Sequence, residues 1–343
     1  MTDGVLDTPL CSVPTRQIRT WSLFLALISL ATLLPFVAAP LVAHVIPEDS
    51  PVIGVYAALA FIGGNFHVAL TGWFYTDREM RSHFRSAPVR YIVIPSVIVS
   101  LNVIAFCFFD SAVRLYVVFI FICWLLWHYQ KQNVGLLSFI AAGTDRVPLS
   151  VWERRTFTLS AIAGISGVFS VIQFGSTNMS TVFAHLHHAG AALYLVLVPI
   201  CFCIAVARNP SLRTNRLRLL YFVIGTTFFL PTYIFSGPVA AIAGYTLAHG
   251  LQYFVFMSFV STSRERTVVS FAWLCIIAAF GGLFLHRASE ASSWLQPPYA
   301  GALYGLFIGL VMTHFVLDAG IWRLREPFQR SYMRKKFDFV FAR

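Results

Sequence analysis

The feature that most constrains this chain is its succession of apolar segments, each long enough to cross a membrane. The hydrocarbon core of a bilayer takes about 20 residues of helix, and ten segments of roughly that length follow one another along the sequence. Backbone polar groups cannot stay unpaired in lipid, so such segments span membranes as helices. The sequence therefore predicts an all-α, polytopic integral membrane helix bundle. The ten predicted segments are residues 21–45, 51–74, 91–109, 115–142, 157–175, 183–207, 219–236, 239–260, 268–285 and 301–322.

Composition supports this class and leaves little protein outside the membrane. Of the 343 residues, 58% are hydrophobic and only 11% are charged, against about 25% charged in soluble domains. We expect a cytoplasmic N-terminal tail at 1–20, a transmembrane domain at 21–322, and a basic amphipathic cytoplasmic tail at 323–343 lying on anionic lipid. The first apolar segment exceeds a signal-peptide core and lacks a clear cleavage site, which indicates a retained helix.

The distribution of basic residues predicts the orientation. If the N-terminus is cytoplasmic, 22 of the 25 basic side chains fall in cytoplasmic loops or tails. Only Arg114 and Arg287 lie outside, and Lys131 lies within a segment. Cytoplasmic loops of membrane proteins carry this excess, so we expect both termini inside, in a bacterial inner membrane. The net charge of +11 thus reflects topology rather than nucleic-acid binding.

Two segments carry helix-breaking or polar residues. Pro231 interrupts the segment 219–236, and a polar cluster lies inside the segment 115–142, where we expect a break near Asn133. A proline removes a helical hydrogen bond and clashes with the preceding turn. The boundaries of these two helices are therefore the least certain of the ten.

Four of the apolar segments carry one histidine each: His67, His128, His249 and His314. Ionisable groups at membrane depth are costly and usually mark functional sites. All four lie on even-numbered segments, which run from outside to inside. At 1.5 Å per residue, His67, His249 and His314 lie roughly 10, 16 and 12 Å above the inner boundary. His128 joins this layer if its segment begins near Leu115, so the four imidazoles are expected to meet.

Each of these histidines has a polar residue three or four positions further on, such as Thr71 after His67, hence on the same helix face. Neutral imidazole is the commonest metal ligand, so we predict that the four histidines bind one divalent ion, with Asp318 as a ligand or supporting partner. Iron with open positions would suit oxygen chemistry, while zinc, manganese and copper stay possible. The catalytic candidates are Lys131, Asp318 and Tyr253. The alternative is that each histidine forms a hydrogen bond across a helix interface.

A denser histidine group lies at the outer entrance of the segment 183–207. It reads H-L-H-H and comprises His185, His187 and His188. A hydrated cluster at the membrane interface is the favoured interpretation. Whether these residues join the metal site stays open.

The last apolar segment closes with M-T-H-F-V-L-D-A-G-I-W-R, from Met312 to Arg323. One histidine per helix with this closing element resembles the Brp/Blh family of membrane β-carotene dioxygenases, whose last helix carries His-x-x-x-Asp followed by aromatic and basic residues. His128 with the next tyrosine, and the stretch 249–254, are similar to two further family elements. The chain departs from the family in having Phe and Val beside His67 instead of Pro and Gly. The resemblance implies a non-haem iron held by the four histidines, cleaving a polyene with dioxygen.

These observations predict a metal-dependent membrane oxygenase or oxidoreductase. Its substrate would be a lipophilic molecule, such as an isoprenoid, a carotenoid-like compound or an acyl lipid, that enters laterally from the bilayer. A haem-binding electron-transfer protein is one alternative, although no segment carries two histidines about 13 residues apart. A transporter with an intramembrane polar site is the other. The bilayer and the substrate are the expected partners, nucleic acid is not, and protein partners are undetermined.

Overall fold

The computed structural model describes residues 15–45, 63–172, 177–263, 267–293 and 295–341. Within these ranges every regular element is helical and there is no strand. Seven helices are long and apolar enough to cross a membrane, which identifies the chain as an integral membrane protein. These candidate spans are Ile18–Val45, Val89–Phe108, Ser111–Gly143, Ser180–Arg208, Val239–Thr262, Thr267–Ser289 and Tyr299–Ile321.

The elements follow one another along the chain with short connections. Residues 63–70 are helical and continue into the 3-10 turn η1. The labelled elements are α1 (Thr15–Val45), η1 (Thr71–Tyr75), α3 (Arg78–Ser86), η2 (Val89–Val93), α4 (Ile94–Phe108), α5 (Ser111–Gly143), α6 (Val151–Val171), α7 (Thr177–Ala192), η3 (Leu193–Leu197), α8 (Val198–Arg208), α9 (Pro210–Thr214), α10 (Arg216–Thr226), α11 (Pro231–Ile234), η4 (Val239–Ala243), α12 (Gly244–Thr262), α13 (Thr267–Ser289), η5 (Ala291–Ser293), α14 (Tyr299–Ile321), α15 (Pro327–Lys336) and α16 (Asp338–Phe341).

Three of the ten predicted segments have no counterpart among the candidate spans. Most of the segment 51–74 falls on residues 46–62, which lie outside the described residues. The segment 157–175 overlaps the 21-residue helix α6. The segment 219–236 is divided into α10 and the short α11, which begins at Pro231, as expected for a residue that favours the first helical position.

The predicted break near Asn133 is wrong, because α5 runs without interruption for 33 residues. The polar side chains that suggested a break have partners on the helix itself and on its neighbour. Asn133 Nδ2 donates to Gln130 Oε1 at 3.0 Å, and Gln130 Nε2 donates to the Gly225 carbonyl at 3.0 Å. Buried polar groups with partners of this kind leave the backbone hydrogen bonds intact.

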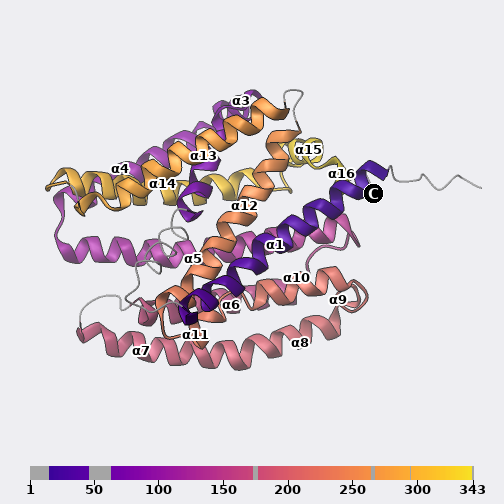
Figure 1. Cartoon of the computed structure of the whole chain (residues 1–343), viewed down its shortest axis with the longest axis horizontal. Coiled ribbons are helices and arrows are strands. Elements are labelled where there is room, and N and C mark those ends of the chain that lie inside the picture. Colours follow the sequence, from indigo (N-terminus) through magenta and orange to yellow (C-terminus); the bar gives the residue numbers. More distant parts are fainter. Residues whose placement is uncertain (1–14, 46–62, 173–176, 264–266, 294, 342–343) are drawn as a thin grey trace, which may run out of the picture.

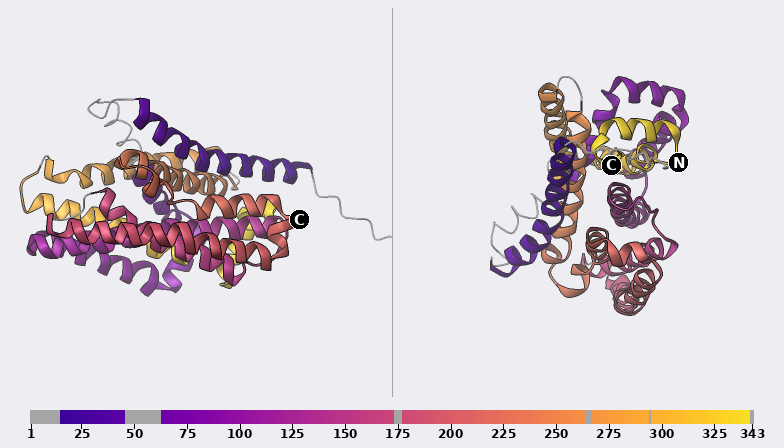
Figure 2. Two further views of the ribbon diagram at one scale, coloured as in Figure 1. Left: turned by 90° about the horizontal axis from the view of Figure 1, so that it is seen from below. Right: turned by 90° about the vertical axis from the view of Figure 1, so that its right-hand side faces the viewer.

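The helices form two groups on either side of α5. Figure 1 shows α4, α13 and α14 above α5, and α6, α7, α8 and α10 below it. α1 and α12 pack against each other and cross the remaining helices obliquely, and the second view of Figure 2 shows them as one wall of the bundle.

Glycines recurring every four residues along α14 allow α4 to approach closely. A Cβ atom at Gly305 would lie 2.6 Å from the Asn102 carbonyl oxygen, and one at Gly309 would lie 2.8 Å from the Val99 Cα atom. Membrane helices that pack through small residues in this spacing gain van der Waals contact and contribute to bundle stability. α14 is thereby fixed against α4 over most of its length.

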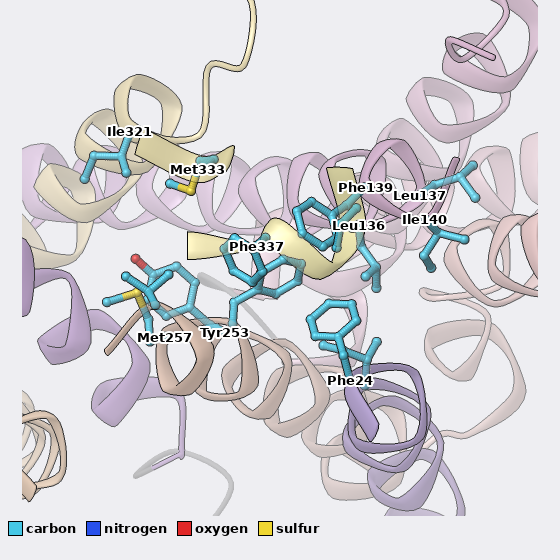
Figure 3. Close-up of a cluster of buried hydrophobic side chains, with 14 of the residues drawn as sticks. Phe24, Leu136, Leu137, Phe139, Ile140, Tyr253, Met257, Ile321, Met333 and Phe337 are labelled. Atoms are coloured by element: carbon cyan, nitrogen blue, oxygen red, sulfur yellow. The ribbon is translucent and has the colours of Figure 1, made fainter. Parts of the chain in front are cut away.

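The apolar side chains of the C-terminal tail pack into the protein. Phe337 and Phe339 are fully or almost fully buried. The Phe337 ring lies 4.8 Å from that of Phe139 in α5 and 5.8 Å from that of Phe256 in α12 (Figure 3). Alternating aromatic and basic residues are expected both in a segment that lies on lipid and in one that packs against protein. In this structure the apolar side chains enter the main core.

Candidate metal centre

The four histidines of the apolar segments meet inside the bundle. His67 comes from the helical residues 63–70, His128 from α5, His249 from α12 and His314 from α14. All four are buried, and one ring nitrogen from each lies within 4.8 Å of the others. Four buried histidines in this arrangement could hold a metal ion. The shared depth predicted from the sequence therefore corresponds to contact in space.

The imidazoles form a closed ring of neighbours. The centroid of the His67 ring lies 4.5 Å from that of His249 and 4.8 Å from that of His314. His128 completes the ring at 5.1 Å from His249 and 5.0 Å from His314. The Nε2 atoms of His67 and His249 are only 3.1 Å apart. Nitrogen–metal bonds of about 2.0–2.3 Å bring ring nitrogens to such separations.

Aromatic residues hold two of the rings in position. Tyr129 stacks on His249, with centroids 4.1 Å apart and planes inclined by 30°. Phe315 stacks on His128 in the same way, at 4.6 Å and 26°. Each stacking residue is the immediate neighbour of one of the histidines along its own helix, so α5 supports the histidine of α12, and α14 supports the histidine of α5.

Several imidazole nitrogens of the four histidines have no hydrogen-bond partner among the described residues. These atoms are Nδ1 of His67, Nε2 of His128, Nδ1 of His249 and Nε2 of His314. The Asp318 Oδ2 atom lies 3.9 Å from Nε2 of His128 and 3.6 Å from Nε2 of His314. Leaving a buried polar atom unsatisfied costs about 1–3 kcal/mol, and a carboxylate facing imidazole lone pairs is repelled. A cation beside Nε2 of His128, Nε2 of His314 and the Asp318 carboxylate would satisfy these atoms, so the donor set fits a metal ion.

A chain of hydrogen bonds determines which nitrogen of His314 faces this group. Tyr253 Oη donates to Asp318 Oδ1 at 2.9 Å, since a carboxylate only accepts. The Thr71 hydroxyl, 2.9 Å from the Tyr253 oxygen, then donates to it. Thr71 Oγ1 in turn accepts from Nδ1–H of His314 at 2.6 Å. The proton of His314 is therefore on Nδ1, and Nε2 presents a lone pair towards the other histidines, as metal-binding imidazoles require.

A further layer of amides supports the backbone around His249. Gln132 Nε2 donates to the His249 carbonyl and to Gln252 Oε1, both at 2.9 Å. Gln252 Nε2 donates to Thr32 Oγ1 at 2.9 Å. α1, α5 and α12 are thereby connected directly behind the histidine ring.

Two of the three catalytic candidates lie at the centre and one does not. Asp318 and Tyr253 belong to the hydrogen-bonded group beside His314. The Lys131 ammonium lies 4.7 Å above the Trp127 ring instead, in a small cleft that Arg154 also lines. Lys131 is an exposed residue, and its long side chain follows the outer surface of α5, although its position in sequence is close to that of His128.

The remaining histidines lie elsewhere. His187 Nδ1 is 3.1 Å from the Gly167 carbonyl, and its ring lies 4.9 Å from that of Tyr233. His185 and His188 are exposed on α7, and none of the three belongs to the metal-binding group of the described residues. Thr71 is the functional residue that the sequence identified only in part, because helical spacing pairs it with His67 whereas its hydroxyl contacts His314.

Comparison with known proteins adds no further constraint. No model of a known protein family matches the chain, and neither a curated protein nor a solved structure matches it significantly.

Proposed function

We propose that this chain is a membrane-embedded, metal-dependent oxidoreductase acting on a lipophilic substrate. The observation that carries the proposal is the convergence of four buried imidazole nitrogens within 4.8 Å of one another, deep in a helix bundle. Asp318 supplies a carboxylate oxygen next to two of them. Such a set of nitrogen and oxygen donors is suited to iron, and also to zinc, manganese or copper.

Iron is the metal that we favour, and the substrate reaction that we infer is an oxygenation. Bound iron with open coordination positions supplies dioxygen chemistry. The resemblance to the Brp/Blh membrane dioxygenases points to the same metal on the same four histidines. The chain's departures from that family, including Tyr253 where the family has a second histidine, favour a substrate other than β-carotene itself.

The protein residues would have separable roles in this chemistry. His67, His128, His249 and His314 would hold the ion, and Asp318 would balance its charge through Oδ2. Thr71 and Tyr253 would hold His314 with Nε2 free and would keep Oδ1 of Asp318 occupied. The surrounding apolar core excludes water, which strengthens every charge interaction at the site.

We propose further that the chain spans a bacterial inner membrane ten times, with both termini in the cytoplasm. The packing supports one cytoplasmic end. Lys335 of the tail pairs with Glu79 at 2.9 Å, and Phe339 packs against Trp21 in the early turns of α1. The tail, the basic region around α3 and the start of α1 are thereby placed together, as the positive-inside rule requires. Reporter fusions after Ser176 and after Arg213 should report opposite sides of the membrane.

Metal analysis of the purified protein tests the proposed centre. Protein extracted in mild detergent should contain close to one metal ion per chain, with iron predominating. His67→Ala should lose that metal, whereas His286→Ala, at the end of α13, should retain it. An optical spectrum of the same samples distinguishes haem, whose intense visible bands would contradict a non-haem centre.

The substrate class is tested in cells. Extracts of lipids from cells with and without the gene should differ in at least one isoprenoid or other lipophilic compound, and the His67→Ala strain should match the strain without the gene. Unchanged lipids together with altered uptake of a polar solute would contradict an oxidoreductase and would favour a transporter.

A further inference from the structure

A cavity of about 620 Å³ opens on the side of the bundle between α4 and α13. Both helices pack against α14, which forms the floor of the cavity together with η1. Its volume is within the range of about 300–1,000 Å³ that is usual for small-molecule sites. α4 contributes Ser96, Val99 and Ser100 to the wall, and α13 contributes Gly281, Phe284 and Leu285.

The floor of this cavity is part of the candidate metal centre. His314 and Thr71 both line it, and these two residues are joined by the hydrogen bond that orients the His314 ring. A molecule in the cavity is therefore adjacent to one of the four histidines without having to pass through the packed core.

The mouth of the cavity faces the hydrocarbon region. α4 and α13 both belong to candidate membrane spans. Leu101 on the first helix is 61% exposed, and Phe280 and Leu283 on the second are 73% and 53% exposed. Large apolar side chains exposed on a membrane span contact lipid, so the cavity is accessible from the bilayer rather than from water.

Two hydroxyl groups on the α4 wall have no hydrogen-bond partner among the described residues. Serines elsewhere in the bundle, such as Ser138, Ser166 and Ser258, donate to the carbonyl four residues earlier on their own helix, which is the usual arrangement in membrane helices. Ser96 and Ser100 make no such bond and both line the cavity. Their hydrogen-bonding capacity is left for a ligand.

The position of these hydroxyls along the helix relates them to the metal centre. Thr313 Oγ1 lies 3.3 Å from the Pro95 carbonyl, so Ser96 on α4 is level with His314 on α14. Ser100 follows one turn further from the cytoplasmic end. Leu310, Leu285 and Phe284 also line the cavity, and they make the wall beside the two serines apolar.

Among the described residues, the lining of the cavity includes no aspartate, glutamate, lysine or arginine. A carboxylate or phosphate group entering it would lose its hydration without gaining a lysine or arginine partner, which is unfavourable. A hydroxyl group would find two free partners in the serines. The lining thus selects against charged lipids.

We infer that this cavity is the substrate site of the proposed oxidoreductase and that its ligand is an uncharged long-chain alcohol. The alcohol group bonds to Ser96 and Ser100 beside His314, and the hydrocarbon chain extends along Leu310 towards Leu285 and the lipid. This inference rests on the proposed function only for the reaction at the metal, because the binding itself is measured separately.

Photoaffinity labelling tests the inference on the full-length protein in lipid nanodiscs. The probe is a long-chain primary alcohol with a diazirine near the hydroxyl group, and the control probe is the fatty acid with the same chain and diazirine. Labelled peptides are identified by mass spectrometry, and the metal content of every sample is measured in parallel. The alcohol should label peptides of α4 and α14, and the acid should label them about tenfold less, since a buried carboxylate without a partner is penalised.

Two variants and a matched control sharpen this test. Ser100→Phe fills the cavity and should abolish labelling of α14 with the metal content unchanged. The double substitution Ser96→Ala with Ser100→Ala removes two hydrogen bonds to the alcohol. It should lower labelling by the alcohol probe about 5–30-fold. Leu101→Phe adds a ring on the lipid-facing side of the same helix. It should change neither the labelling of α14 nor the metal content.

The outcomes separate this inference from the proposed function. Equal labelling by alcohol and acid, or labelling by the alcohol that Ser100→Phe leaves unchanged, overturns the inference. Selective labelling of wild-type protein that contains no metal supports the lipid site and overturns the metal-dependent function.

Discussion

Two of the polar groups that are buried in this bundle differ in how completely their atoms are paired. One is the ion cluster around Arg218 at the start of α10, and the other is the histidine ring. Arg218 has no exposed side-chain surface, yet its nitrogens donate to Glu153 and Asp145 at 3.0 Å and to two backbone carbonyls. Four nitrogens of the histidine ring have no hydrogen-bond partner among the described residues.

The difference indicates what each group contributes. Around Arg218 the protein supplies every acceptor that the guanidinium can use, and Glu153 also caps the start of α6 by accepting from the Ser150 amide at 2.7 Å. Such a group joins α6, α10 and the loop that precedes α6, and it needs nothing from outside. The histidine ring leaves nitrogens unpaired, and this is why we propose that it holds a metal ion.

The largest expected effect is on folding and comes from the paired group. Arg218→Met leaves Glu153 buried without its cation, and breaking a buried pair in this way costs about 3–5 kcal/mol. The thermal unfolding midpoint in a fixed detergent should fall sharply, with or without added metal. Arg216→Met removes an exposed arginine two residues earlier and is the matched control. Equal midpoints for the two variants would contradict the structural role.

The histidine ring should behave in the opposite way. His249→Leu should lose the metal and the stability that metal binding adds, so its unfolding midpoint should no longer respond to a chelator. In metal-free protein the same substitution removes one unpaired nitrogen together with one contact to His67, so the midpoint should stay close to that of metal-free wild type. A large loss of stability in metal-free protein would show that the ring is a structural hydrogen-bonded group instead.

Removal of the hydrogen bonds that orient His314 should lower the metal affinity without abolishing metal binding. Tyr253→Phe and Thr71→Val each interrupt the chain that holds His314 with Nε2 free. Loss of such a supporting partner typically lowers metal affinity about 10–100-fold. Titration with a competing chelator measures this affinity. The double variant should be little worse than either single variant, because both changes break one chain; additive losses would contradict a shared path.

The smallest effect is expected at Lys131, which lies near His128 in sequence and apart from the ring in space. Lys131→Met retains much of the contact with Trp127 and removes only the charge. We expect metal content to be unchanged and stability to shift by at most about 0.5 kcal/mol, as for most exposed substitutions. A clear loss of metal or of lipid conversion would show that the lysine reaches the site during the reaction.

The fold class and the proximity of the four histidines could be predicted from the sequence, because both depend only on position along the chain. Apolar length indicates which segments enter the membrane, and distance along a segment indicates depth. His67, His128, His249 and His314 were expected at one depth, and the structure places them in contact. The spacing of Asp318 from His314 likewise located the carboxylate, since residues four apart share a helix face.

The parts that could not be read from the sequence depend on which faces of different helices meet. Spacing assigned Thr71 to His67, whereas packing brings its hydroxyl to His314. The direction of the Lys131 side chain and the burial of Phe337 depend in the same way on neighbours that are distant in sequence. One such signal was readable: the glycines at 301, 305 and 309 mark the face of α14 on which another helix packs closely.

The length of α5 has a consequence for how the protein responds to its membrane. Its 33 residues extend for about 50 Å, well beyond a hydrocarbon core of about 30 Å. Hydrophobic mismatch of this size normally forces a helix to tilt or the bilayer to thicken. Here the last turns contain the fully buried Leu137 and Ile140, and they pack through Phe139 against Phe337 and Phe341 of the C-terminal tail. Protein covers the end of α5 that exceeds the hydrocarbon core. A thinner or thicker bilayer should therefore shift the lipid boundary only along the first half of α5, and the depth of His128 in the membrane should stay the same.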